Sequence, residues 1–391
     1  MTKTVSIRKR FLWHPSDLDA YYSDDCEERK YMYGRPRPTP MASLLNLELR
    51  EYELIRFYNN ESTPLLVATT GKDTEAQGLW MANVTKLNTS NKALKEICMA
   101  FATMHMGHNR KSARYVLKNG QEHPKSAGPP KDMRQVAGYT RLDDEVLQQM
   151  FIQLTSAAKA HQRQIQTMTL ASYEAVLLSS VLIYLHAMSM GPYVPLFNFD
   201  GGADLFSLGR TIRDLSLVYS DKMEGRSPYY YNIDIDLGEK RAKLPREEDL
   251  WAIIDFVDTD EDLSRLEKRR IKRALTTELK NLIYLFHLDR EAVSVSHIAA
   301  WCTFWTPNFY SLLREEANTY ALLFVCYWCG YAHMWHVLFW WGDRILDDLL
   351  YLKDHLPERV HHFLEWPLQC CTRYDVSYID LLSGKLRNLY F

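Results

Sequence analysis

The segment Tyr320–Trp341, YALLFVCYWCGYAHMWHVLFWW, decides the fold class of this chain. It contains no Asp, Glu, Lys or Arg, and it is long enough for a bilayer span of roughly 20 residues. His333 and His336 lie in its second half, however, and polar groups inside lipid are rare and need partners. The charged residues on its two flanks also show little of the Lys/Arg asymmetry that orients membrane helices. The segment therefore predicts a buried central helix of a soluble protein, with no membrane span.

Apolar periodicity and capping residues predict helices on both sides of this segment. The stretch 172–190 is nearly all apolar and ends at Gly191-Pro192, and a helix that is apolar all round is a buried one. Helices are predicted over 44–58, 91–108, 143–168, 172–190, 203–219, 258–288, 297–305, 309–341, 345–356, 358–365 and 377–386.

The order of these elements predicts an all-α protein, because the chain has neither βαβ alternation nor an internal repeat. Residues 1–40 contain alternating prolines and are interpreted as an N-terminal arm or linker. Residues 41–391 are expected to form a single large domain of stacked helix pairs around an internal apolar cavity. Gly- and Pro-containing or polar stretches predict loops at 119–131 and 222–246, and the second loop has alternating apolar residues that would also suit a short strand.

Composition limits the function classes. The chain has 391 residues, of which 47% are hydrophobic and 25% charged, and its formal net charge is −2. This balance argues against a nucleic-acid-binding surface over the whole molecule. Met1–Arg10 is polar and basic with no apolar stretch behind it, and the seven cysteines are scattered. We therefore expect an intracellular protein, cytoplasmic or nuclear or both, with free thiols.

The chemistry-bearing patterns favour structural roles. Cys326-x-x-Cys329 lies inside the apolar segment, whereas a redox or metal-binding pair would need exposure and positive neighbours. His333 and His336 share a helix face, but no HExxH pattern is present and no carboxylate joins them at helical spacing, so no metal site is expected. The acidic runs 258–262 and 347–348 resemble metal-binding motifs of terpene synthases. The run 347–348 lacks the required third carboxylate, and the run 258–262 lies where a helix is expected to start. No nucleotide, dinucleotide or nucleophile motif is present, so the sequence indicates no cofactor.

The basic run Lys268–Arg273 has two interpretations. Runs of this type serve as nuclear-import signals or phosphate contacts. A solvated helix face, balanced by the acids just before it, is the other interpretation.

Several short segments resemble, in their order and spacing, the ligand-binding half of fungal zinc-cluster transcription factors of the sterol uptake control type. The resemblance covers residues 44 to about 369, or most of the chain. It is carried by Leu47-Glu48-Leu49, Ala100–Met106, Glu174–Ser180, Ala203–Phe206, Arg213-Asp214-Leu215, Trp340-Trp341-Gly342 and Trp366-Pro367. The end of the long helix departs from the family pattern at Trp341-Gly342-Asp343.

The resemblance implies a helical pocket that accepts a sterol, with occupancy controlling homodimerisation and nuclear entry. The family's DNA-binding module needs six closely spaced thiolates, whereas Cys26 is the only cysteine among the first 97 residues, so no direct nucleic-acid binding is expected. An apolar small molecule is the expected partner, because aromatic and Met side chains suit a rigid apolar polycycle. The candidate lining residues are Tyr184, Met188, Phe197, Phe206, Phe324, Tyr331, Met334, Trp335, Phe339 and Trp340, with His333 and His336 as polar contacts.

Two alternatives stay open at this point. The same residues are equally compatible with a plain hydrophobic core. A protein related to these factors could also have become an enzyme of secondary metabolism, a cyclase or pericyclase acting on a terpenoid or polyketide by shape and a few polar contacts. In that case His333 and His336 are the candidate catalytic residues.

Overall fold

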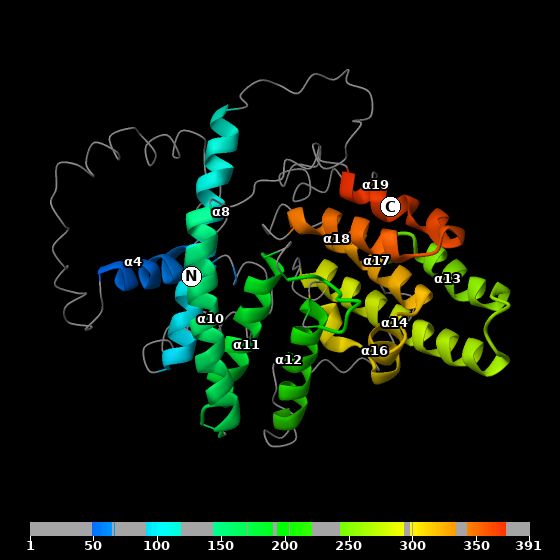
Figure 1. Ribbon diagram of the computed structural model, residues 1–391, viewed down its shortest axis with the longest axis horizontal. Helices are drawn as coiled ribbons and strands as arrows, with labels where there is room; N and C mark the ends of the chain where they lie inside the picture. The colour runs from blue at the N-terminus through cyan, green and yellow to red at the C-terminus, as the bar shows by residue number, and fades with distance from the viewer. Residues whose placement is uncertain are drawn as a thin grey trace, which may run out of the picture.

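The computed structural model describes residues 49–64, 66, 91–118, 144–169, 171–190, 194–202, 204–220, 243–292, 298, 300–333 and 342–372. Every regular element in this part of the chain is a helix, so the predicted all-α fold class is confirmed (Figure 1). The predicted arm 1–40, the loop 119–131, residues 222–242 of the second loop and the predicted helix 377–386 lie outside the described residues.

The N-terminal group of helices packs around one apolar cluster. It consists of α4 (Leu49–Phe57) with the π-helical turn η2 (Tyr58–Ser62), α8 (Lys92–Lys118), α10 (Asp144–Gln166) and α11 (Tyr173–Met188). Leu94, Ile97 and Phe101 of α8 are buried against its partners, at the spacing of three and four residues that places side chains on one helix face. This cluster is called the N-terminal core below.

The remaining helices pack around a second and larger cluster, called the C-terminal core below. They are α12 (Leu205–Ser220), α13 (Glu247–Phe256), η6 (Val257–Thr259), α14 (Arg265–Ala292), η7 (Trp301–Phe304), α16 (Pro307–Arg314), α17 (Thr319–His333), α18 (Gly342–His355), η9 (Glu358–Leu364) and α19 (Glu365–Thr372). α17 lies in their middle and contacts α13, α14, α16, α18, α19 and η9. Residues 320–333 of α17 are all buried, as predicted for a central helix.

α11 belongs to both groups. It contacts α8 and α10 on one side and α12 on the other, and Figure 1 shows it between them. Val181 and Leu185 pack against both apolar clusters. The uniformly apolar sequence of this helix is explained by burial on both sides.

The prediction of one charged helix over 258–288 is wrong at its start. α14 begins at Arg265, and the acidic run lies in η6 and the turn that follows it. Asp260 accepts hydrogen bonds from the Tyr320 hydroxyl (2.7 Å) and the Arg359 guanidinium (2.6 Å), so it connects this turn to α17 and η9. The preceding helix α13 was not predicted.

The prediction of one long helix over 309–341 is also wrong. α16 ends at Arg314 and α17 begins at Thr319. Ala317 between them is left-handed, with φ 43°. Asn318 then accepts hydrogen bonds at Oδ1 from the backbone N–H groups of Tyr320 and Ala321, which caps the new helix.

Two shorter elements are 3₁₀ helices where α-helices were predicted. The described part of the predicted helix 297–305 contains the 3₁₀ turn η7, and 358–365 is mainly the 3₁₀ helix η9. Among the described residues, no helix combines the length and apolar character that a membrane crossing requires.

Candidate ligand site around Trp301–Thr306

Seven of the twelve residues predicted to contact a ligand are described, and all seven are buried: Tyr184, Met188, Phe197, Phe206, Phe324, Tyr331 and His333. The other five, Met334, Trp335, His336, Phe339 and Trp340, lie outside the described residues. The buried ones belong to the C-terminal side of the molecule, with the six apolar ones in the C-terminal core.

These seven side chains do not all lie around one common space. Phe206 packs edge-on against Trp305, with ring centroids 4.3 Å apart, whereas Phe324 packs against Phe309 at 6.3 Å. Tyr331 faces another direction: its hydroxyl donates to the carbonyl of Pro245 (2.8 Å). The structure therefore brings Phe206 and Tyr184 to one region, around residues 301–306, and places Tyr331 elsewhere.

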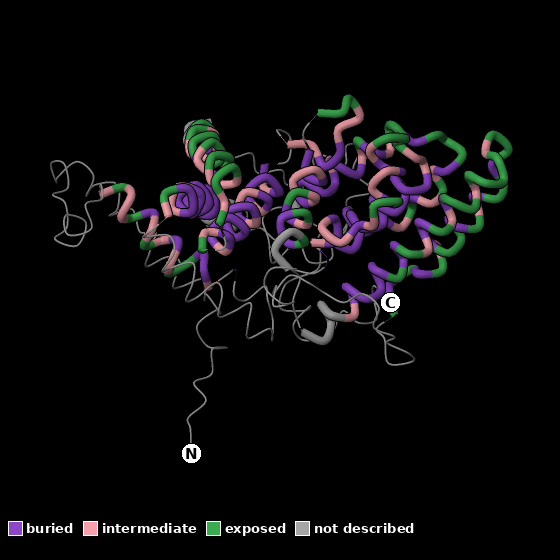
Figure 2. Tube along the Cα trace, turned by 90° about the horizontal axis from the view of Figure 1, so that it is seen from below, coloured by how far each residue is buried: buried purple, intermediate pink, exposed green. Residues whose placement is uncertain are grey.

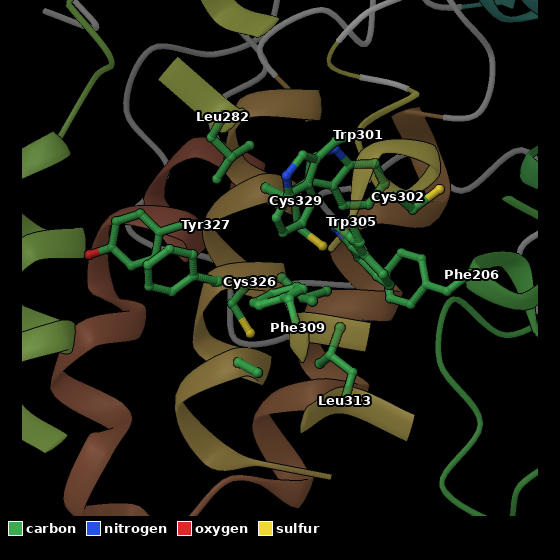
Figure 3. Packing of buried hydrophobic residues seen from close by; sticks show 14 of the residues in the cluster. Phe206, Leu282, Trp301, Cys302, Trp305, Phe309, Leu313, Cys326, Tyr327 and Cys329 are labelled. Carbon is green, nitrogen blue, oxygen red and sulfur yellow. The ribbon is translucent and has the colours of Figure 1, made fainter. Parts of the chain in front are cut away.

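An aromatic cluster fills this region (Figure 3). Trp301 contacts Trp305, Phe309 and Trp328 at centroid distances of 5.1, 5.7 and 6.2 Å. The rings come from η7, the chain after it, α16 and α17, and Phe206 joins them from α12. Offset and edge-to-face pairs at these distances are favourable beyond simple area burial.

Two indole N–H groups in this cluster have no acceptor in the part of the chain that the structure describes. Trp301 Nε1 and Trp305 Nε1 are buried without a hydrogen-bond partner among the described residues. By contrast, Trp328 Nε1 donates to the carbonyl of Ile298 at 2.7 Å. A buried donor without an acceptor costs about 1–3 kcal/mol, so each such group requires an explanation, and an oxygen atom of water or of a ligand is the ordinary one.

A carboxyl group lies beside the same segment. Glu278 of α14 is fully buried, and its Oε1 accepts from the backbone N–H of Thr306 at 2.7 Å. Its Oε2 accepts from Asn281 Nδ2 at 3.1 Å. Burial raises the pKa of Glu278 to about 7, although the contacts with Thr306, Asn281 and Arg213 lower it in part. At neutral pH this carboxyl therefore exists in both the neutral and the charged form.

Further polar contacts hold the segment in place from α11 and α12. The Arg213 guanidinium donates to the carbonyl of Trp305. The Tyr184 hydroxyl and the Cys302 thiol lie 3.1 Å apart. Burial raises the pKa of Cys302 to about 12, so it is a neutral thiol and not an activated nucleophile. Gly209 of α12 makes room for this thiol, because a Cβ there would lie 2.5 Å from Cys302 Sγ.

The thiol pair Cys326 and Cys329 is buried inside α17, as predicted for two core side chains. The described residues contain no group of three or more His, Cys, Asp or Glu side chains placed to hold a metal ion.

The polar centre of the site was missed by the sequence analysis, although a signal for it existed. Ile271, Leu275, Leu279 and Leu282 are buried at helical spacing, and Glu278 lies on that same apolar stripe of α14. A carboxylate within an apolar stripe is unusual and indicates a buried polar contact. The indole N–H groups of Trp301 and Trp305 lack an acceptor among the described residues, and the ionisable carboxyl of Glu278 lies beside them in an apolar interior. Donors in such surroundings suit the recognition of a ligand oxygen.

Comparison of the sequence with protein-family models finds no match. Comparison with curated proteins finds no significant match either.

Proposed function

We propose that this protein is a ligand-binding regulatory domain that takes an apolar molecule of the sterol or isoprenoid class into its helical interior. The observation that carries this proposal is the pair of buried indole N–H groups of Trp301 and Trp305, which lack an acceptor among the described residues and lie beside the ionisable carboxyl of Glu278. The apolar body of such a molecule is favoured by the surrounding aromatic side chains. Its one or two oxygen atoms would satisfy the indole donors.

The chemistry of the site restricts the ligand. Most side chains around residues 301–306 are aromatic or aliphatic, the nearby Glu278 is itself an acid, and the nearby Arg213 already donates to the Trp305 carbonyl. A polyanionic ligand such as a nucleotide would leave most of its charge without a partner in this interior. A hydroxyl or a carbonyl on an apolar skeleton matches the number of available donors.

The test is a titration of the full chain with dehydroergosterol, a fluorescent sterol that accepts excitation energy from tryptophan. We expect saturable energy transfer. Trp305→Phe keeps an aromatic ring but removes one unpaired N–H, and it should weaken binding by roughly tenfold, the value of one hydrogen bond. Trp251→Phe is the matched control, because Trp251 is 40% exposed on α13 and its indole already donates to Glu247.

Two results would contradict the proposal. One is the absence of saturable transfer with a correctly folded chain. The other is an equal effect of Trp305→Phe and Trp251→Phe on affinity. Native mass spectrometry after incubation with a lipid extract extends the test to other apolar molecules of similar size.

A second candidate function is favoured by the pKa of Glu278. A carboxyl with a pKa of about 7 is suited to give or take a proton at neutral pH, which a cyclase acting on an apolar precursor would require. Glu278→Gln separates the two functions. Loss of turnover with retained binding supports an enzyme, whereas bound molecules recovered unchanged from the wild-type protein support a binding domain.

A further inference from the structure

The exposed face of α14 carries a row of cations. Arg265, Arg269 and Arg273 follow one another at intervals of four residues, and all three are exposed. On a helix this spacing places side chains on one face about 6 Å apart along the axis. Lys280 continues the same face. No carboxylate lies on this face between positions 265 and 280, because the two acids of this stretch, Glu267 and Glu278, lie on the other side of the helix.

These arginines differ from the other cations of the basic run. Lys272 forms ion pairs with Asp255 and Asp258, and Lys268 donates to the carbonyl of Asp258. Arg270 pairs with Glu316. Arg265, Arg269 and Arg273 have no ion pair in the part of the chain that the structure describes. The five cations of the run 268–273 thus divide into three that bond to other parts of the fold, Lys268, Arg270 and Lys272, and two that do not among the described residues, Arg269 and Arg273.

The helical conformation of residues 268–273 argues against their recognition as an extended nuclear-import signal. Residues 268–273 lie inside the continuous helix α14, with Ile271 buried in the C-terminal core. A receptor that reads an extended basic peptide would have to unwind this helix and expose Ile271. The row is therefore presented to a partner as a rigid helix face.

The surroundings of the row favour a short partner. Asp258, Glu261 and Asp262 are exposed just before its first arginine. A nucleic-acid duplex or an anionic membrane would have to cover these acids together with the arginines, which is unfavourable. An apolar contact is also available, because Leu266 is 77% exposed beside Arg269 and Arg270. Figure 1 shows the turn between α13 and α14 at one end of the described molecule, opposite α4, so the start of the row lies at an accessible end.

We propose that this face, defined by Arg265, Leu266, Arg269 and Arg273, docks an acidic helical segment of a partner protein. Carboxylates at intervals of four residues on the partner would pair with the three arginines, and one apolar residue of the partner would cover Leu266. Such pairing sets specificity and association rate, and it weakens with added salt. This surface lies on the side of α14 opposite Glu278, so it is independent of the ligand proposed above.

The test uses the full chain and a fluorescein-labelled synthetic helical peptide with Glu at positions i, i+4 and i+8 and one Leu beside them. Fluorescence anisotropy should show saturable binding that weakens between 50 and 300 mM salt. The triple variant Arg265→Gln, Arg269→Gln, Arg273→Gln should reduce the affinity by roughly tenfold or more, as expected for three partly exposed ion pairs. Adding Leu266→Ala to the triple variant should reduce the peptide affinity further.

The control variant removes the same charge elsewhere. Arg50, Arg56 and Arg163 are exposed on α4 and α10, and their replacement by Gln should leave the affinity within twofold. A peptide of the same composition with its Glu residues scrambled out of register should bind weakly. Equal losses in the two triple variants, or equal binding of the two peptides, would overturn the proposal. So would preferential binding to a 20-base-pair DNA duplex or to vesicles with 30% phosphatidylserine.

Discussion

At the scale of single residues, Glu278 is the side chain whose ionisation bears most on the C-terminal core. Its pKa is about 7 in the folded chain and 4.5 when the group is free in solvent, so folding favours the neutral form. A raised pKa of an acid means that its contribution to stability is fully present below pH 4.5. That contribution is lost as the pH rises through 7. The surrounding apolar side chains are the cause, because they solvate a neutral carboxyl better than a carboxylate.

Glu278→Gln should remove this pH dependence. The amide oxygen can still accept from the Thr306 N–H, and the side chain can no longer ionise. At pH 8 the variant should be more stable than the wild type by up to about 3 kcal/mol, and the difference should fall towards zero near pH 4.5. Urea denaturation of both proteins at pH 5, 6, 7 and 8 measures this difference in the free energy of unfolding. The exposed Glu248→Gln is the control, and a constant offset between wild type and Glu278→Gln across this range would contradict the assignment.

At the scale of elements, α17 and α19 approach each other closely because of one glycine. Gly330 lies under the Trp366 ring, and a Cβ added to it would lie 2.8 Å from Trp366 Cζ3. The same tryptophan stacks on Tyr327 at a centroid distance of 5.4 Å and contacts Tyr331 at 5.2 Å. The glycine therefore allows a large aromatic side chain to cover the backbone of the central helix.

Gly330→Ala should destabilise the protein by about 1–3 kcal/mol, the usual cost of overpacking a dense core. The penalty should be smaller in a chain that also carries Trp366→Leu, because the smaller side chain can yield space. Thermal unfolding of the four proteins of this double-mutant cycle gives the coupling energy. A Gly330→Ala protein with wild-type stability would show that the ring moves aside without cost.

The break between α16 and α17 is the second feature at this scale. Ala317 adopts φ 43°, a conformation that costs an L-residue roughly 1–2 kcal/mol and glycine little. Ala317→Gly should therefore stabilise the protein by about 1 kcal/mol. The same change at Ala321, inside α17, should destabilise it by at least about 1 kcal/mol, because glycine weakens helix interiors. Denaturation midpoints of the two variants test the prediction, and a loss of stability in Ala317→Gly would contradict it.

The sequence predicted most helices, because their apolar periodicity is strong and their ends carry Gly, Pro or capping residues. It did not predict the break at 315–318, since Ala317 is an excellent helix former and no Gly or Pro is present there. Asn318 was the available signal, because it caps α17. The start of α14 was misplaced because the acidic run 258–262 looked like a first helical turn, whereas Asp260 is bonded to Tyr320 and Arg359 from distant parts of the chain.

The candidate site was predicted less well than the helices. The structure brings two of the predicted lining residues, Tyr184 and Phe206, next to residues 301–306. The sequence analysis did not select Trp301 and Trp305. A sequence cannot show which of several tryptophans lacks an acceptor, since this depends on where distant carbonyl groups lie. Trp328 finds one at Ile298, and Trp301 finds none among the described residues.

At the scale of the whole molecule, the pKa shifts of buried groups predict that the two cores respond to mild acid, between about pH 7 and 4.5, in opposite directions. Figure 2 shows the buried residues along the inner sides of both helix groups. Three buried histidines lie in the N-terminal group: His105 on α8, His161 on α10 and His186 on α11. Burial lowers the pKa of each to about 4 from the usual 6.5. In the C-terminal core, Glu278 contributes more stability as the pH falls.

The N-terminal group should therefore unfold first in acid. A lowered histidine pKa means that the stability contribution is present above pH 6.5 and is lost as the pH falls towards 4. Each histidine contributes a slope of up to about 1.4 kcal/mol per pH unit in this range. Hydrogen exchange at pH 5 should show loss of protection in α8 and α10 before α14 and α17. His161→Gln, which can keep the bond to Ser180, should reduce the slope by roughly a third. Simultaneous loss of protection in all four helices would contradict this.

The position of α11 has a consequence for dividing the chain. Ala175, Leu178 and Leu182 face the N-terminal core, whereas Val176, Leu177 and Tyr184 face the C-terminal core. A fragment that ends after α11 would expose the second set to solvent, and a fragment that begins after it would lack its covering helix. We expect each half to aggregate when produced alone and the two to reassemble when co-expressed, so the region between α11 and α12 is a natural place for a split-reporter design.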